Sequence, residues 1–380
     1  MEYIEREIEP EIVKRLDSGK VNIIYGPRQS GKTTMVRHLV SSQELNPLWL
    51  DADMLDVREL VSDMSPEKWR RILQGHTTLV IDEAQRIDGI GLSLKILIDH
   101  VPGIQVIVTG SSALNLRNRT DEPLTGRNFS YTLLPPSFRE LAAKDILTEQ
   151  RALEERLVFG SYPGVLAESE DRARVLSSLA SSYLYKDVLS LEGIAKPPVL
   201  DKLIRALAFQ VGQEVSFQEL GGLVGIDRKT VEKYVDLLEK SFVLFDLSAY
   251  SGNLRNEIKK AHKIYFYDLG IRNAVIGNLL PLSARSEVEI GHLWENYLIA
   301  ERLKGNVNLA IPVRSYFWRT HTQQEVDYIE EKNGTLLAWE MKWNPAKVKK
   351  TLPASFTNAY PNAQTGFVTP KNMCDFLLGY

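Results

Sequence analysis

The sequence predicts an α/β protein whose first third holds a parallel β-sheet. Short apolar runs alternate there with polar, helix-forming stretches, and the series ends at Pro135 and Pro136. Parallel strands read as continuous apolar runs of this kind, because crossover helices bury both faces of the sheet. We expect five strands, at residues 21–25, 48–53, 77–82, 105–110 and 129–134.

The rest of the chain is divided by proline pairs and by changes in apolar spacing. A chain of 380 residues with 44% hydrophobic content is too long for a single hydrophobic core, because one core stops growing at about 250 residues. We therefore expect more than one core. Apolar spacings of three and four predict helices from Phe138 to about Ile194, and Pro197 and Pro198 end that stretch. We expect four domains: 1–136, a helical lid at 137–196, 197–280, and an α/β unit at 281–380.

Composition excludes several classes of protein. The 46 Lys and Arg residues nearly balance 49 Asp and Glu residues, which gives a net charge of −3. Nucleic acid would therefore be bound by a local patch and not by the whole surface. The single cysteine, Cys374, excludes an internal disulfide and a multi-cysteine zinc site. No apolar stretch approaches about 18 residues, so we expect a soluble cytoplasmic protein without a membrane segment.

A phosphate-binding loop follows the first predicted strand. The run from Gly26 to Thr33 matches G-x-x-x-x-G-K-[ST], and a predicted helix follows it. Backbone N–H groups would surround the phosphates of ATP, Lys32 would neutralise their charge during catalysis, and Thr33 would bind Mg²⁺. The expected nucleotide-binding residues are Gly26, Pro27, Arg28, Gln29, Ser30, Gly31, Lys32, Thr33 and Thr34.

Two further strands add polar groups at the edge where ligands sit in open α/β sheets. The run TTLVID ends in Asp82, which is followed by Glu83. Asp82 would hold Mg²⁺, and Glu83 would activate the attacking water as a general base. The strand at 105–110 leads to Thr109, Ser111 and Ser112. We expect Ser111 to contact the γ-phosphate, whereas Ser112 would cap the next helix.

With these motifs the chain resembles a family of bacterial and archaeal AAA+ P-loop ATPases whose C-terminal domain has no assigned function. The resemblance extends through LTGRNFSYTLLPPSFRE, GSYPGVL and SYLYKDV, and so covers nearly the whole chain. In AAA+ proteins an arginine from a neighbouring subunit completes the site. The resemblance therefore implies a homo-oligomer, with a hexamer as a candidate assembly. Arg127 is the catalytic arginine that we expect, and Arg117 and Arg119 are alternatives.

Residues 199–247 resemble a winged helix-turn-helix, which implies contact with DNA. Ser216 and Asp227 would cap its second and third helices, and Gly225 would form the turn between them. The candidate DNA-binding residues are Arg228, Lys229, Arg255, Lys259 and Lys260, together with Lys263 in the same basic loop. Lys347, Lys349 and Lys350 form a second basic group. The alternative is that these lysines form a solvated surface, and acidic residues beside Arg228 and Lys229 favour a packing role.

The last hundred residues resemble the restriction-endonuclease-like fold. They carry a helical glutamate, Glu295, then Asp327 in one strand, then Glu340 and Lys342 two residues apart in the next strand. The resemblance implies that Asp327 and Glu340 bind Mg²⁺, that Glu295 completes the metal site, and that Lys342 assists the attacking hydroxide. Two alternatives remain: a scaffold that no longer cleaves, and ordinary surface strands with alternating charge.

Taken together, these motifs predict an ATP-hydrolysing motor that binds and remodels DNA, including branched DNA, and grips or cleaves it with its C-terminal domain. The alternative function is a nucleotide-controlled switch or scaffold that binds a protein partner, with an inactive nuclease-like domain. ATPase stimulation by DNA would separate the two functions.

Overall fold

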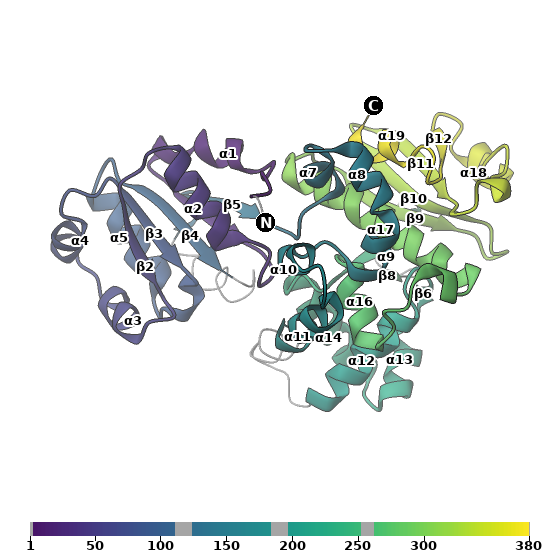
Figure 1. Cartoon of the computed structure of the whole chain (residues 1–380), viewed down its shortest axis with the longest axis horizontal. Helices are drawn as coiled ribbons and strands as arrows, with labels where there is room; N and C mark the ends of the chain where they lie inside the picture. Colours follow the sequence, from purple (N-terminus) through teal and green to yellow (C-terminus); the bar gives the residue numbers. More distant parts are fainter. Residues whose placement is uncertain (1–2, 111–123, 184–196, 252–261, 380) are drawn as a thin grey trace. The chain divides into compact units, whose positions relative to one another are not determined.

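The computed structural model describes residues 3–110, 124–183, 197–251 and 262–379. It divides the chain into two compact units. Unit 1 runs to Pro136, and unit 2 holds the elements from Ser137 onward (Figure 1). Most residues of the segments expected as the lid, the third domain and the C-terminal domain lie within unit 2, whereas Lys240–Phe242 belong to unit 1.

Unit 1 is a five-stranded parallel sheet in the order β2-β3-β4-β1-β5, which confirms the predicted parallel α/β core. The strands are β1 (Val21–Tyr25), β2 (Pro47–Asp51), β3 (Thr78–Asp82), β4 (Gln105–Gly110) and β5 (Asn128–Thr132). The helices of this unit are α1 (Glu9–Val13), α2 (Lys32–Ser42), α3 (Leu55–Ser62), α4 (Pro66–Leu73) and α5 (Ile90–His100).

Both faces of the unit 1 sheet are buried. Neighbouring residues of a strand point to opposite faces, so Ile23 joins one core and Ile24 the other. Helices α1 and α2 cover the face of Ile24, with Ile12 and Met35 in that core. Helices α3, α4 and α5 cover the opposite face, where Trp69 is fully buried. This two-sided burial explains why the central strands β1, β3 and β4 are largely apolar, whereas the edge strand β5 is more polar and less buried.

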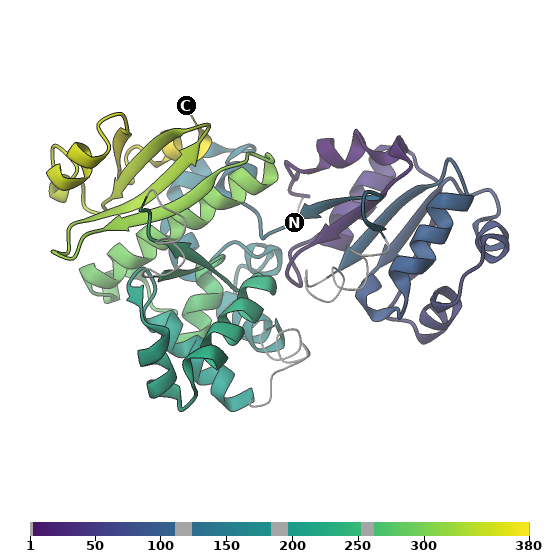
Figure 2. The same ribbon diagram turned by 180° about the vertical axis from the view of Figure 1, so that it is seen from behind.

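Unit 2 begins with helices and continues into two small sheets (Figure 2). Its helices are α7 (Phe138–Ala142), α8 (Ile146–Arg151), α9 (Leu153–Phe159), α10 (Pro163–Ala167), α11 (Arg172–Tyr183), α12 (Pro197–Phe209), α13 (Phe217–Val224), α14 (Arg228–Lys240), α16 (Leu269–Ile276), α17 (Glu287–Asn308), α18 (Ala354–Ala359) and α19 (Met373–Leu378). Its strands are β6 (Glu214–Val215), β7 (Leu244–Ser248), β8 (His262–Phe266), β9 (Arg314–Arg319), β10 (Glu325–Lys332), β11 (Thr335–Met341) and β12 (Gln364–Val368).

The two sheets of unit 2 differ in topology. Strands β6, β8 and β7 form an antiparallel sheet in that order; along the chain, β6 lies between α12 and α13, whereas β7 and β8 follow α14. The second sheet has the order β12-β11-β10-β9; its first pair is parallel and the others are antiparallel. Helix α17 leads into β9 along the chain and also contacts β8 of the first sheet. This helix therefore joins the two halves of unit 2.

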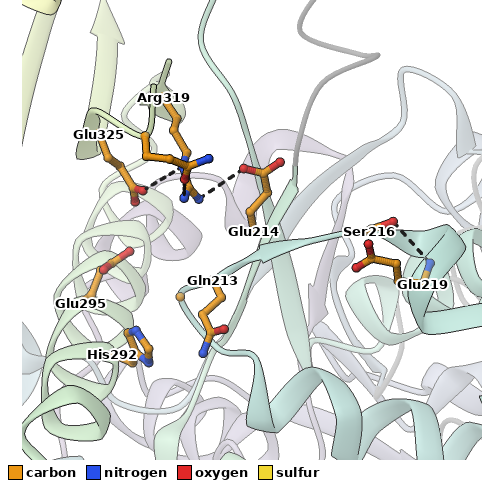
Figure 3. A pocket seen from close by; sticks show the side chains of 10 residues that line it. Gln213, Glu214, Ser216, Glu219, His292, Glu295, Arg319 and Glu325 are labelled. Atoms are coloured by element: carbon orange, nitrogen blue, oxygen red, sulfur yellow. Dashed lines mark hydrogen bonds and ion pairs between the residues drawn. The ribbon is translucent and has the colours of Figure 1, made fainter. Parts of the chain in front are cut away.

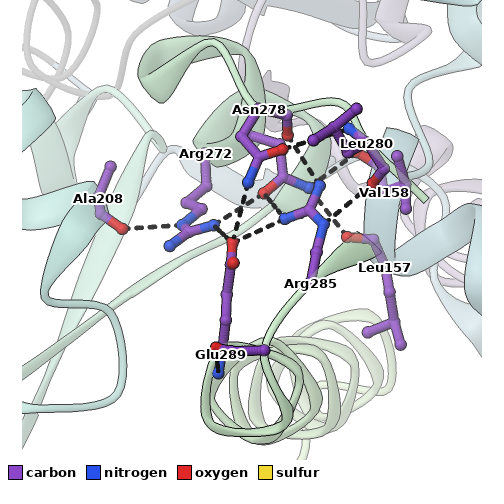
Figure 4. Close-up of polar contacts among 10 residues, drawn as sticks. Leu157, Val158, Ala208, Arg272, Asn278, Leu280, Arg285 and Glu289 are labelled. Carbon is purple, nitrogen blue, oxygen red and sulfur yellow. Dashed lines mark hydrogen bonds and ion pairs between the residues drawn. The ribbon is translucent and has the colours of Figure 1, made fainter. Parts of the chain in front are cut away.

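A buried polar network holds α9, α12, α16 and α17 together (Figure 4). Arg272 donates its Nε–H to the Ala208 carbonyl oxygen at 2.8 Å. Arg285 donates to Glu289 Oε1 at 2.9 Å. The amide of Asn273 donates to the carbonyl oxygens of Leu157 and Val158 at 3.0 and 2.9 Å. Helical segments far apart in the sequence are thereby fixed to one another, since each buried polar group requires a partner.

The start of α16 packs directly against the end of α9. Asp268 caps α16 by accepting from Ile271 N at 3.1 Å, and it also accepts from Ser161 N at 2.7 Å. A Cβ atom added to Gly270 would overlap the Phe159 carbonyl oxygen. Glycine is required here by the close approach of two backbones.

We predict that Gly270→Ala destabilises unit 2 by about 1–3 kcal/mol, because the new methyl group overpacks a backbone contact. The control is Gly222→Ala in α13, where an added Cβ meets nothing within 4 Å. That substitution should stabilise by up to about 1 kcal/mol, through helix propensity alone. Urea unfolding followed by circular dichroism measures both changes. Equal effects of the two substitutions would contradict the packing argument.

Candidate nucleotide site and acidic cluster

The phosphate-binding loop lies between β1 and α2 in unit 1. It follows Tyr25, the last residue of β1, and α2 begins at Lys32. Gln29 and Gly31 have φ values of 58° and 97°, in the left-handed region. Successive backbone N–H groups in a turn that contains such left-handed residues point to one side of the loop and form an anion-binding concavity. The local geometry therefore suits phosphate.

Lys32 is buried, and its ammonium group lies over the loop. Its Nζ donates to the carbonyl oxygens of Gly26 and Pro27 at 2.9 and 2.8 Å. Arg6, which the sequence analysis missed, supports the same loop from the N-terminal segment. It is buried and donates to the carbonyl oxygens of Ser30 and Leu134 at 3.0 and 2.6 Å. No motif marks Arg6, because its role depends on a contact with residues far along the chain.

Asp82 joins three elements at the carboxyl edge of the sheet. Thr33 Oγ1, in α2, donates to Asp82 Oδ2 at 2.8 Å. Thr109 Oγ1, at the end of β4, donates to Asp82 Oδ1 and accepts from Glu83 N at 3.1 Å. Oxygen ligands of this type suit Mg²⁺, which binds proteins through one or two carboxylates together with substrate phosphates. Thr33 and Asp82 therefore fit the metal expected with ATP.

Glu83 adopts a left-handed backbone conformation, with φ 55°. Its Oε2 accepts from Gln85 Nε2 at 2.5 Å, a contact that sequence reasoning missed. Glu83 is half-buried and directly follows Asp82 at the end of β3. The Gln85 amide orients the carboxylate through Oε2, and the other carboxylate oxygen can still accept a proton from water.

Arg127 lies at the amino-terminal end of the parallel strands, opposite the carboxyl-terminal end that carries the phosphate-binding loop of its own chain. It directly precedes β5, whose first residue pairs with Val21 at the start of β1. The four residue steps of β1 separate this end from the loop by about 13 Å. Arg127 donates its Nε–H to Asp99 Oδ1 at 2.8 Å and is 41% exposed. Of the other predicted groups, Ser111, Ser112, Arg117 and Arg119 lie outside the described residues.

In unit 2 the structure brings together the four residues of the predicted nuclease motif, three of them around the Lys342 ammonium. Asp327 Oδ2, in β10, accepts from Met341 N at 2.7 Å and from Lys342 Nζ at 3.3 Å. The same ammonium lies 3.1 Å from Glu340 Oε1. Burial lowers the pKa of Lys342, but Asp327 and Glu340 outweigh it, and the pKa is raised. This lysine therefore stays charged.

The fourth residue, Glu295, belongs to a neighbouring group of carboxylates. Carboxylate oxygens of Glu295, Glu325 and Asp327 lie within 4.8 Å of one another. Glu295 Oε1 accepts from Tyr265 OH at 2.6 Å and from Lys263 Nζ at 2.9 Å. Burial raises the pKa of Glu295 to about 7, although Lys263 opposes this shift.

The involvement of Lys263 corrects the expectation that it belongs to a basic surface. It is 1% exposed and forms ion pairs with Glu295 and Glu325, so it does not reach a phosphate at the surface. Its sequence neighbours suggested otherwise, because only the pairing of β8 shows which way the side chain points. Arg255, Lys259 and Lys260 lie outside the described part of the chain.

An open polar cavity of about 580 Å³ lies beside this group (Figure 3). Figure 3 shows Glu295 and His292 on α17 facing the cavity, with Arg319 between Glu325 and Glu214. Arg319 NH1 lies 3.3 Å from Glu214 Oε2, and its Nε lies 3.6 Å from Glu325 Oε2. Burial and the nearby Lys263 lower the pKa of His292. Four glutamates line the cavity, with Glu219 as the fourth, so it is predominantly acidic.

The predicted surface groups Arg228 and Lys229 are exposed at the start of α14. Arg228 donates to Glu232 Oε1 at 2.7 Å, within the same helix. Asp227 caps this helix by accepting from Thr230 N at 3.0 Å, and Ser216 caps α13 by accepting from Glu219 N at 3.3 Å. Lys347 pairs with Glu287 at 2.7 Å and remains 59% exposed, and Lys349 and Lys350 are exposed.

Comparison with known families divides the chain into three parts. Residues 18–142 match the AAA domain, and residues 150–281 and 290–375 match two domains of unknown function, DUF8612 and DUF4143. An uncharacterized protein of Mycobacterium tuberculosis is 26% identical over 342 residues, which cover 89% of this chain and 73% of that protein. One from Haemophilus influenzae is 24% identical over 356 residues, with coverage of 86% and 83%.

Solved structures are similar to this chain at low identity. The Walker-type ATPase of Pyrococcus abyssi has a TM-score of 0.48 and 15% identity, and the match covers 72% of this chain and 96% of that chain. The RuvB Holliday junction branch migration motor of Thermotoga maritima has a TM-score of 0.30 and 17% identity, with coverage of 63% and 88%. The AAA domain match and the parallel sheet support an AAA-type P-loop core in unit 1. No helix within the described ranges has the length and apolar character needed to cross a membrane.

We predict that Glu83→Gln leaves ATP binding intact and slows hydrolysis by about 10²–10⁴-fold, because only the proton-accepting group is removed. Lys32→Ala should instead weaken ATP binding, since the ammonium over the loop is lost. Phosphate release and equilibrium binding of a fluorescent ATP analogue measure the two effects. The control is Glu67→Gln, an exposed glutamate of α4, which should change neither. Hydrolysis by Glu83→Gln at the wild-type rate would contradict the assignment of the base.

Proposed function

We propose that unit 1 hydrolyses ATP with Mg²⁺ and that this reaction controls the binding of a partner by unit 2. The observation that carries the proposal is the arrangement around Asp82, where Thr33 and Thr109 hold the carboxylate and Glu83 follows it. Thr33 and Asp82 would hold the ion, and Lys32 would meet the phosphate charge. Glu83 would take a proton from water. These roles use groups already gathered at the carboxyl edge of the sheet.

Hydrolysis would need a second copy of the chain. Arg127 lies at the far end of the parallel strands from its own phosphate-binding loop, so it would serve the nucleotide of a neighbouring subunit. An arginine supplied in this way neutralises charge that develops during phosphoryl transfer. A cyclic homo-oligomer, such as a hexamer, would place each Arg127 beside the next loop.

For unit 2 we propose DNA as the partner. The order α12, β6, α13, α14, β7, β8 is the order of a winged helix, and Arg228 and Lys229 project from the start of its third helix. Basic residues at such a position can contact phosphates. The order α17, β9, β10, β11, α18, β12 supports a restriction-endonuclease-like fold for the C-terminal half. Driven by ATP hydrolysis, such a protein would remodel DNA, including branched DNA.

One observation favours a second candidate, a nucleotide-controlled switch or scaffold that binds a protein. The 580 Å³ cavity carries four glutamates and one arginine. The negative charge of these glutamates repels the phosphates of DNA. The cavity therefore suits a cationic side chain of a partner protein better than DNA. In this case ATP hydrolysis would respond to the protein partner and not to nucleic acid.

We predict that Arg127→Ala keeps ATP binding and loses turnover by about 10³-fold or more. Mixing Arg127→Ala protein with Glu83→Gln protein should restore part of the activity, because some sites then combine an intact Glu83 with an intact Arg127. Phosphate release against mixing ratio measures this recovery. The control is Asp99→Ala, which removes only the partner of Arg127 and should retain turnover. A monomer with full activity would rule out the shared site.

We predict that DNA stimulates ATP hydrolysis and that the double variant Arg228→Ala, Lys229→Ala weakens DNA binding. Two lost phosphate contacts should reduce the slope of log K against log salt by about 2. Glu232→Ala is the opposing control, since it frees Arg228 from its carboxylate and should strengthen binding. Gel shifts with linear, forked and four-way DNA, with and without ATP, provide the measurement. If no DNA binds or stimulates hydrolysis, the protein-partner function is favoured.

A further inference from the structure

The acidic group in unit 2 has the dimensions of a metal site. Carboxylate oxygens of Glu295, Glu325 and Asp327 lie within 4.8 Å of one another, and they come from α17 and β10. Three carboxylates at this spacing repel one another unless a cation lies among them. In a restriction-endonuclease-like fold that cation would be a divalent metal ion.

A side chain of the protein itself supplies positive charge at this place. Lys263 enters from β8, its Nζ lies 2.9 Å from Glu295 Oε1, and it forms a second ion pair with Glu325. Its side chain is almost completely buried, and the ammonium lies 5.4 Å from the centre of the Phe317 ring. A buried ammonium without partners would be very unfavourable, so these carboxylates are what keeps Lys263 inside.

Other donors occupy much of the remaining capacity of these carboxylates. Tyr265 OH donates to the same Glu295 oxygen as Lys263. Arg319 lies beside the second oxygen of Glu325, at 3.6 Å. Asp327 Oδ2 accepts from Met341 N and from Lys342 Nζ. A divalent ion would have to displace a buried ammonium and compete with these donors, one of which, Met341 N, belongs to the backbone of β11. These residues therefore do not fit a resident Mg²⁺.

We propose that the Lys263 ammonium permanently takes the place of a metal ion in this cluster. The C-terminal half of unit 2 is then a scaffold that needs no divalent cation and grips its partner without cutting it. The inference concerns unit 2 alone, and it holds whether the partner is DNA or protein and whether or not ATP is hydrolysed.

The test measures Mn²⁺ binding by the full chain, with Asp82→Asn in every protein to remove a metal ligand of unit 1. With Lys263 present, electron paramagnetic resonance should show no bound Mn²⁺. Lys263→Met should create one site, because it removes the charge and keeps a long apolar side chain. Adding Asp327→Asn to Lys263→Met should abolish that site, and Lys263→Arg should create none, since it keeps the charge.

Stability gives a second readout. Lys263→Met should lower the Tm in the absence of metal, because three carboxylates are left uncompensated, and Mn²⁺ should restore the Tm with increasing concentration. The protein with Lys263 should show no such response. The proposal is overturned if Lys263→Met folds and binds no Mn²⁺. It is also overturned, even if Lys263→Met fails to fold, when the Lys263 protein binds Mn²⁺ and loses it on Asp327→Asn.

Discussion

A charge removed from water requires a partner inside the protein, and this constraint shapes both units. In unit 1, Asp82 is buried, and two threonine hydroxyl groups share its two oxygens. Lys32 is buried with two backbone carbonyl groups as its acceptors. These contacts are much weaker than those with a phosphate and a metal ion would be. The site is thus held in place by hydrogen bonds that nucleotide could replace.

Unit 2 satisfies the same constraint in a different way. Two of its buried carboxylates are paired with buried lysines: Glu301 with Lys304 at 2.7 Å, and Glu295 with Lys263 at 2.9 Å. Such pairs are costly to break, because removal of one partner leaves the other buried and uncompensated. The charged groups at the site of unit 1 therefore remain available to a ligand, whereas many buried charged groups of unit 2 are paired with one another. This difference supports the proposal that unit 1 hydrolyses ATP and unit 2 binds a partner.

The ion pairs of Lys263 also show why the later domains are hard to separate. Lys263 lies in β8, within the segment expected as the third domain, and its partners lie in α17 and β10 of the segment expected as the C-terminal domain. The network around Arg272 and Asn273 likewise ties α16 to α9 and α12. Domain boundaries inferred from proline pairs reflect changes in local pattern. They do not report contacts between distant segments.

Local pattern alone determined the parallel sheet of unit 1, because both of its faces are buried and its central strands are correspondingly apolar. It also predicted that the phosphate-binding loop and Asp82 lie at one edge, since parallel strands end together. Only the tertiary structure decided the roles of Arg6, Gln85 and Lys263. The sequence does not show whether a lysine or arginine side chain faces water or a buried carboxylate. The direction of the side chain depends on strand pairing and helix packing. Thus Lys263 reads as a surface charge in the sequence, yet the pairing of β8 with β6 and β7 directs it into a buried acidic cluster.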